Sequence, residues 1–175
     1  MTIGRLGLRL AVGGLMAGHG LQKLNGSFGG PGLEGTAQMM GKLGIHPAKH
    51  QARAVALSET LGGALTAAGF LSPLGPAMIT GTMAVAIAKV HAKNGVWVTK
   101  GGYEYNLVLI AAALTLAGDG PGLVSIDGIL RKQRRGSGWA IAAGTLGAGA
   151  AFATMKLADR LAPAPEPDQD VPASA

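Results

Sequence analysis

Residues 89–106 read Lys-Val-His-Ala-Lys-Asn-Gly-Val-Trp-Val-Thr-Lys-Gly-Gly-Tyr-Glu-Tyr-Asn, and this polar stretch joins two long apolar runs. It contains three of the four Trp and Tyr residues of the chain. In an ordinary soluble protein such a stretch would be a surface loop. We instead predict that it caps a polar pocket at one end of a bundle of membrane helices.

The composition is typical of packed membrane helices. The chain has 175 residues, of which 48% are hydrophobic and 14% are charged, whereas charged residues make up about 25% of a typical soluble domain. The 30 glycines suit helices whose backbones approach closely in a bilayer. The absence of cysteine excludes disulfides, thiolate metal sites and cysteine nucleophiles. The net charge of +6 is scattered between apolar runs, which argues against nucleic acid as a partner.

Apolar segments recur along most of the chain and predict an all-α membrane protein. The first four would form a four-transmembrane-helix bundle, and a further C-terminal transmembrane helix would follow. Between the first two, apolar residues at helical spacing from Leu33 to Leu43 predict a short helix on the membrane surface. The five predicted spans cover approximately residues 3–24, 53–71, 74–90, 105–117 and 139–157.

Two alternatives concern these spans. Several are shorter than the roughly 20 residues that cross a bilayer comfortably, so a soluble helical bundle is the alternative fold, although it would have almost no polar exterior. Arg5 and Arg9 could also begin a signal peptide, but no convincing small-x-small cleavage site follows before Lys23. We therefore predict an uncleaved first span, with Gly14-x-x-x-Gly18 as a close-packing face.

Polar side chains gather at the ends of the first four spans. Helices joined by short loops run antiparallel, so these ends should lie on one side of the membrane. Ionisable groups inside membrane spans usually face one another or a cavity. The predicted pocket residues are His19, Lys23, Glu59, Lys89, His91, Asn94, Glu104 and Asn106.

Glu59 lies deepest in its span and should pair with Lys23, Lys89 or a histidine. Two interpretations stay open at this point. The cluster is either a ligand or redox pocket, or an ion-pair network that only holds the helices together. At the opposite end of the bundle, Asp127 is expected to form a structural ion pair with Arg5 or Arg9.

The sequence predicts no metal site and contains no catalytic motif, which leaves open whether the protein is an enzyme. His46 and His50 are four residues apart but lie beside Lys49 at a loop–helix border, and no other histidine or carboxylate pair has metal-ligand spacing. No Ser-His-Asp order, P-loop or dinucleotide-binding signature is present. The chain has no redox group of its own, so electron transfer would require a bound cofactor or a partner.

Charge distribution predicts the orientation and the domain limits. The basic run at residues 131–135 indicates a cytoplasmic end, which would place the N-terminus inside and the pocket outside. The predicted organisation is a four-helix membrane domain at 1–130, a basic loop with the fifth helix at 131–160, and a disordered, acidic, Pro-rich tail at 161–175.

Three motifs resemble those of the DoxX family of small integral membrane proteins. Residues 9–24 resemble its opening helix, Glu59-Thr-Leu-Gly-Gly63 resembles a segment of its second helix, and Gly120-Pro-Gly-Leu-Val-Ser-Ile-Asp127 is similar to its Gly-Pro-Gly-x-x-Ser-x-Asp signature. The resemblance covers about residues 5 to 130 and implies a four-helix membrane frame.

The resemblance also implies a functional setting. The family is named for a membrane subunit of an archaeal thiosulfate:quinone oxidoreductase system, and mycobacterial relatives are described as membrane anchors in an oxidoreductase complex. It therefore implies an inner-membrane, oxidative-stress-linked oxidoreductase subunit whose pocket would bind either a quinone cofactor or a small sulfur oxyanion. The partners would be the lipid bilayer and other subunits of a membrane redox complex. A non-enzymatic scaffold for soluble enzymes is the alternative, and a small transporter has less support because no inverted repeat is evident.

Overall fold

The computed structural model describes residues 3–163, and every regular element in that range is helical. The long helices occur where the apolar spans were predicted, so the all-α class is confirmed. The predicted acidic tail lies largely in residues 164–175, outside the described part. The elements are α1 (Ile3–Asn25), η1 (Ser27–Gly29), α2 (Gly32–Lys42), α3 (Ala48–Ala68), α4 (Leu74–Ala86), the π-helical turn η2 (Ile87–His91), η3 (Ala92–Asn94), η4 (Val98–Lys100), α5 (Glu104–Asp119), α6 (Ile126–Ile129) and α7 (Ser137–Arg160).

One helix within residues 3–163, α7, is long and apolar enough by length and composition to cross a bilayer. α4 and α5 have only 13 and 16 residues. α1 and α3 are longer, with 23 and 21 residues, but charged residues and glycines lower their mean hydropathy. Length and composition therefore do not confirm the four-transmembrane-helix bundle.

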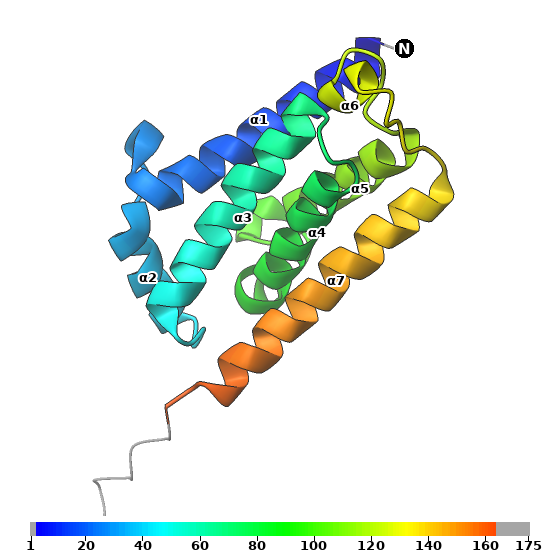
Figure 1. Ribbon diagram of the computed structural model, residues 1–175. Coiled ribbons are helices and arrows are strands. Elements are labelled where there is room, and N and C mark those ends of the chain that lie inside the picture. Colours follow the sequence, from blue (N-terminus) through cyan, green and yellow to red (C-terminus); the bar gives the residue numbers. More distant parts are fainter. Residues whose placement is uncertain (1–2, 164–175) are drawn as a thin grey trace, which may run out of the picture.

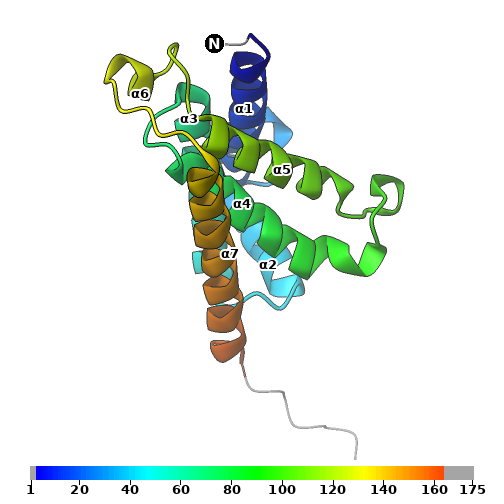
Figure 2. The same ribbon diagram turned by 90° about the vertical axis from the view of Figure 1, so that its right-hand side faces the viewer.

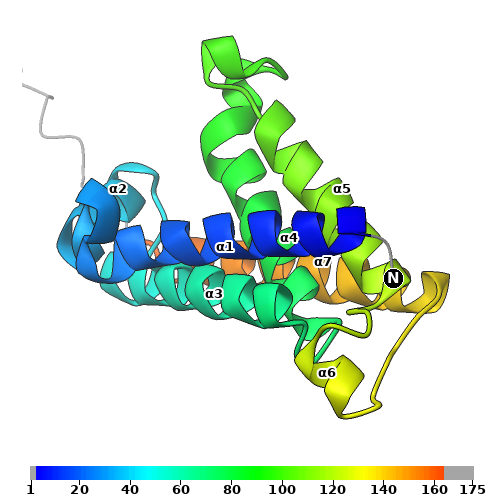
Figure 3. The ribbon, with the colours of Figure 1, turned by 90° about the horizontal axis from the view of Figure 1, so that it is seen from above.

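The helices form an antiparallel pair, a hairpin and a covering helix. α1 and α3 lie side by side along their lengths, and α2 packs across one end of α3 (Figure 1). α4 and α5 form a hairpin, and α7 packs against both of them (Figure 2). Figure 3 shows the tip of this hairpin projecting away from the α1–α3 pair. The hairpin thus crosses the pair obliquely, whereas the sequence predicted a bundle of adjacent antiparallel helices.

Glycines bring the backbones of α1 and α3 into direct contact. A Cβ atom at Gly63 would lie 2.3 Å from the backbone nitrogen of Ala17, and one at Gly13 would lie 2.7 Å from the carbonyl oxygen of Gly63. The expected close-packing face, Gly14 and Gly18, is wrong, because a Cβ atom at either position meets nothing within 4 Å. The contacting face is instead offset by one residue, since α3 packs on the side of α1 that carries Gly13.

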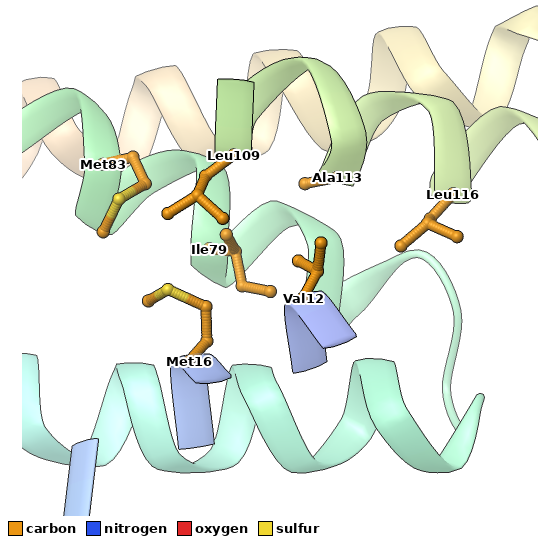
Figure 4. Close-up of a cluster of buried hydrophobic side chains, with 7 residues drawn as sticks. All are labelled: Val12, Met16, Ile79, Met83, Leu109, Ala113 and Leu116. Carbon is orange, nitrogen blue, oxygen red and sulfur yellow. The ribbon is translucent and has the colours of Figure 1, made fainter. Parts of the chain in front are cut away.

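The hydrophobic core lies where α1 meets the α4–α5 hairpin. Figure 4 shows the side chains of α1 pointing toward those of α4 and α5. Ile79 and Ala113 are completely buried there. The cluster consists of Val12, Met16, Ile79, Met83, Leu109, Ala113 and Leu116. The hairpin is therefore held to the α1–α3 pair by apolar packing near its base.

Arg9 fastens the end of α1 that lies near α6. Its side chain is 5% exposed. The guanidinium donates hydrogen bonds to the carbonyl oxygens of Ala67 at 3.1 Å, Val124 at 2.7 Å and Pro121. One side chain thus joins α1, the end of α3 and the loop before α6. We call these contacts the Arg9 node.

The predicted ion pair between Asp127 and Arg5 or Arg9 is wrong. The Asp127 carboxylate instead accepts hydrogen bonds from the backbone N–H groups of Leu71 at 3.2 Å and Ser72 at 2.9 Å. Arg5 donates to the carbonyl oxygen of Asp119 at 2.9 Å. Carboxylates bind backbone N–H groups strongly, and the α3–α4 turn offers two such groups beside α6. Asp127 therefore fixes a turn, while the arginines bind carbonyl groups.

We expect Gly147→Leu to detach α7 from α4. A Cβ atom at Gly147 would lie 2.7 Å from the carbonyl oxygen of Ala77 and 2.9 Å from the nitrogen of Gly81, so a larger side chain must push the helices apart. Limited trypsin digestion at the basic run 131–135 should release α7 from the variant and leave it bound in the wild type. Gly149→Leu, which faces open space, is the control and should retain α7.

Candidate functional site

A cavity of about 390 Å³ lies at the opposite end of α1 from Arg9, and we call it the polar cavity. Its walls come from α1, α2, α3, α4, the π-helical turn η2 and the start of α5. The convergence of these elements agrees with the prediction from antiparallel topology. Six of the eight predicted pocket residues line it, namely His19, Lys23, Glu59, Lys89, His91 and Asn106.

An ion pair between α1 and α3 forms one wall of the polar cavity. The Nζ atom of Lys23 donates to Oε2 of Glu59 at 2.6 Å. The Glu59 side chain is 5% exposed and that of Lys23 is 20% exposed. The prediction that Glu59 pairs with Lys23, Lys89 or a histidine is confirmed for Lys23. Because buried charges are costly unless paired, this pair also explains how a carboxylate is retained between apolar helices.

Three further polar side chains complete the cavity wall. Nδ1 of His19 lies 3.1 Å from Oε1 of Gln22, one turn along α1. Nδ1 of His91 lies 2.7 Å from the carbonyl oxygen of Gly101, which ties η2 to the loop before α5. Asn106 is buried, and its Nδ2 atom lies 3.3 Å from the sulfur of Met83. A thioether is a weak acceptor, so the amide of Asn106 keeps most of its hydrogen-bonding capacity.

Lys89 faces the same cavity but pairs with α7. Its Nζ atom lies 3.3 Å from Oδ1 of Asp159, whose side chain is 58% exposed. An exposed pair of this kind contributes little to stability. Sequence reasoning missed Asp159 because the predicted pocket was built from the first four spans alone. Both lysines of the polar cavity therefore have a carboxylate partner.

Asn94 and Glu104 do not line the polar cavity, so their placement in it is wrong. Asn94 turns back into its own loop, where Nδ2 donates to the carbonyl oxygen of Gly101 at 3.1 Å. Glu104 is the first residue of α5 and precedes Asn106 by two positions. Two residues along an α-helix rotate the side chain by about 200°, so Glu104 cannot share the cavity face with Asn106.

Methionines form much of the apolar wall, and sequence reasoning missed them. Met16, Met39, Met40 and Met83 line the polar cavity, and these are four of the seven methionines of the chain. Flexible thioether side chains suit a surface that adapts to different ligands. One signal was present in the sequence, because Met16, His19 and Lys23 follow each other at spacings of three and four residues. Such residues share one helix face.

The arrangement can bind a small molecule through hydrogen bonds inside an apolar enclosure. Its volume lies within the roughly 300 to 1,000 Å³ that is usual for small-molecule sites. Within residues 3–163, no group of three or more His, Asp or Glu side chains could hold a metal ion. The polar groups of its lining are two imidazoles, the buried amide of Asn106, the Lys23–Glu59 pair, the ammonium group of Lys89 and the hydroxyls of Thr82 and Tyr105.

The fold and the cavity define a small all-helical protein whose ionisable groups face one another inside apolar walls, as is usual in membrane proteins. The DoxX family model matches residues 4–92, just over half of the chain. The protein therefore belongs to the DoxX family, which is membrane-associated. No curated protein and no solved structure shows significant similarity to the chain.

Proposed function

We propose that this protein is a multi-pass subunit of a membrane oxidoreductase system and binds a quinone-type ligand in the polar cavity. α1, α3, α4 with η2, α5 and α7 cross the bacterial inner membrane in this proposal. The N-terminus lies on the cytoplasmic side, and the polar cavity faces the outside. The observation that carries the proposal is the meeting of His19, Glu59, His91 and Asn106 in one cavity of about 390 Å³.

The pairing of both lysines favours an uncharged ligand over a sulfur oxyanion. Lys23 lies 2.6 Å from the Glu59 carboxylate and Lys89 lies 3.3 Å from that of Asp159. A small oxyanion would have to compete with these carboxylates. A quinone carbonyl, by contrast, needs only a hydrogen-bond donor, which Asn106 and an imidazole N–H provide. The quinone supplies the redox chemistry when bound, and His19 and Glu59 are placed to hold or release its protons.

A second candidate function is a non-enzymatic scaffold that anchors soluble enzymes at the membrane. The exposure of Arg131, Lys132 and Arg135 favours it, because such a basic segment binds anionic lipids or acidic protein surfaces. Arg134 has another role, since it donates to the carbonyl oxygen of Ser72 at 3.0 Å and lies 5.5 Å from the Trp139 ring.

Binding of a chainless quinone to the purified full-length protein in nanodiscs tests the proposal. The ligand is 2,3-dimethoxy-5-methyl-1,4-benzoquinone, and calorimetry measures its affinity. We expect Glu59→Gln to weaken binding by about tenfold, because it disturbs a charge-assisted hydrogen bond in the cavity wall. His91→Ala should weaken binding as well. Thiosulfate should bind more weakly than the quinone to the wild-type protein.

The matched control is Glu34→Gln, which neutralises an exposed carboxylate of α2 that does not line the polar cavity. This variant should bind the quinone as the wild type does. Unchanged quinone affinity in both Glu59→Gln and His91→Ala would refute the ligand site. The scaffold function would then be favoured if neutralising Arg131, Lys132 and Arg135 abolished the binding of partner proteins and the cavity variants did not change it.

A further inference from the structure

A second cavity of about 450 Å³ lies between α3, α4 and α7, and we call it the apolar groove. Its lining is almost entirely aliphatic, with Met78 and Val85 from α4 and Leu146 from α7 among its residues. Ala54 of α3 and Ala150 of α7 lie on its two sides and are exposed. The groove is therefore open sideways, between α3 and α7.

The apolar groove and the polar cavity adjoin each other. Their linings share residues of α2, the α2–α3 loop, α3 and α4, which form the border between the two spaces. Ser58 and Thr82 mark this border, since their hydroxyl oxygens lie 3.1 Å apart. Ser58 precedes Glu59 of the polar cavity directly. The five shared residues are Met40, Ile45, Val55, Thr82 and Val85.

The two spaces differ sharply in chemistry. The polar cavity holds the Lys23–Glu59 pair and two imidazoles. The apolar groove holds no charged side chain, and its polar groups are the Gln51 amide and the hydroxyls of Ser58, Thr82 and Thr154. A site of this form is complementary to a molecule with a compact polar head and an extended apolar part.

We infer that one amphiphilic ligand occupies both spaces, with its hydrogen-bonding head in the polar cavity and a single apolar chain in the groove between α3, α4 and α7. The inference rests on the proposed function for the head and adds the place of the chain. It also gives α7 a role, because α7 forms one side of the groove. α7 lies outside the segment that matches the family model. The sideways opening lets the chain enter from the surrounding lipid.

A pair of probes that differ only in the chain tests the inference. Decylubiquinone carries a ten-carbon chain, and 2,3-dimethoxy-5-methyl-1,4-benzoquinone has the same head without it. Lipid chains are as apolar as the groove, so the chain gains affinity through packing alone. In nanodiscs of one composition, we expect Ala150→Phe to weaken decylubiquinone binding about fivefold, because the ring fills the groove and removes that packing. The affinity for the chainless probe should not change.

Two further variants complete the experiment. Ala54→Phe, from the opposite side of the groove, should reproduce the effect of Ala150→Phe. Ala148→Phe changes an exposed residue of α7 that does not line the groove, and it should bind both probes as the wild type does. Comparing variants in identical nanodiscs cancels the partition of the probes into lipid.

The outcomes separate this inference from the proposed function. Suppose that Ala150→Phe and Ala54→Phe leave the affinity for decylubiquinone unchanged while Glu59→Gln lowers the affinity for both probes. The binding of the head in the polar cavity is then supported, and the binding of the chain in the apolar groove is refuted. If neither probe binds the wild-type protein, both are refuted. If the groove variants lower the affinity for both probes equally, their effect does not depend on the chain, and the inference again fails.

Discussion

Gly63→Leu is expected to force α1 and α3 apart and to destabilise the protein strongly. A Cβ atom at this position would lie 2.3 Å from the nitrogen of Ala17 and 2.6 Å from the carbonyl oxygen of Gly13. These neighbours are backbone atoms of a helix, so they cannot move aside as a flexible side chain could. Overpacking typically costs about 1–3 kcal/mol, and we expect more than about 3 kcal/mol here. Equilibrium unfolding in mixed micelles measures the loss.

Gly14→Leu provides the matched control for this variant. It introduces the same side chain into α1 one residue beyond Gly13, where the added atoms meet nothing within 4 Å. Its free energy of unfolding should stay within about 0.5 kcal/mol of the wild type, as for most surface changes. Equal destabilisation by both variants would show that glycine matters at these positions for another reason than the contact between α1 and α3.

Arg9→Met is the change with the second largest expected effect. It keeps a long side chain but removes the hydrogen bonds to the carbonyl oxygens of Ala67, Pro121 and Val124. Hydrogen bonds to charged groups contribute about 1.5–3 kcal/mol each, and part of this is offset because the methionine avoids burying a charge. A net loss of about 3 kcal/mol in the free energy of unfolding is expected.

Arg5→Met tests whether this effect belongs to the Arg9 node. Arg5 lies one turn earlier on α1 and makes one hydrogen bond, to the carbonyl oxygen of Asp119. Its replacement should cost about 1 kcal/mol or less. Hydrogen exchange gives a second measurement, since Arg9→Met alone should speed exchange at the backbone amide of Asp127, which bonds to Gly69. An unchanged exchange rate there would contradict the role assigned to Arg9.

The sequence predicted the helices because their signals are local. Apolar runs separated by Gly and Pro place the boundaries of α3 and α4 to within a few residues. The contact between Lys23 and Glu59 was also predictable, since antiparallel helices joined by short connections bring the end of one beside its neighbour. Few other charges were available to pair with so deep a carboxylate. The antiparallel topology and the high free-energy cost of an unpaired buried carboxylate were together enough to predict this ion pair.

The remaining features depend on tertiary geometry that a sequence pattern does not contain. Asp127 was expected to bind an arginine because opposite charges attract, but the amides of Leu71 and Ser72 only become available once the α3–α4 turn has formed. The pairing of Lys89 with Asp159 depends on where α7 packs. The oblique hairpin follows from the shapes of the packed surfaces. Shape complementarity of this kind is not visible in hydrophobic periodicity.

The Arg9 node has a consequence for the smallest part of this chain that can fold independently. The segment that matches the family model ends at residue 92, but two of the three carbonyl groups that bind Arg9 belong to Pro121 and Val124. α5 adds Leu109, Ala113 and Leu116 to the core. A fragment cut at residue 92 would expose the core faces of α1 and α4 and leave Arg9 without two of its three acceptors. The limits of sequence similarity and those of the autonomous folding unit are therefore different in this protein.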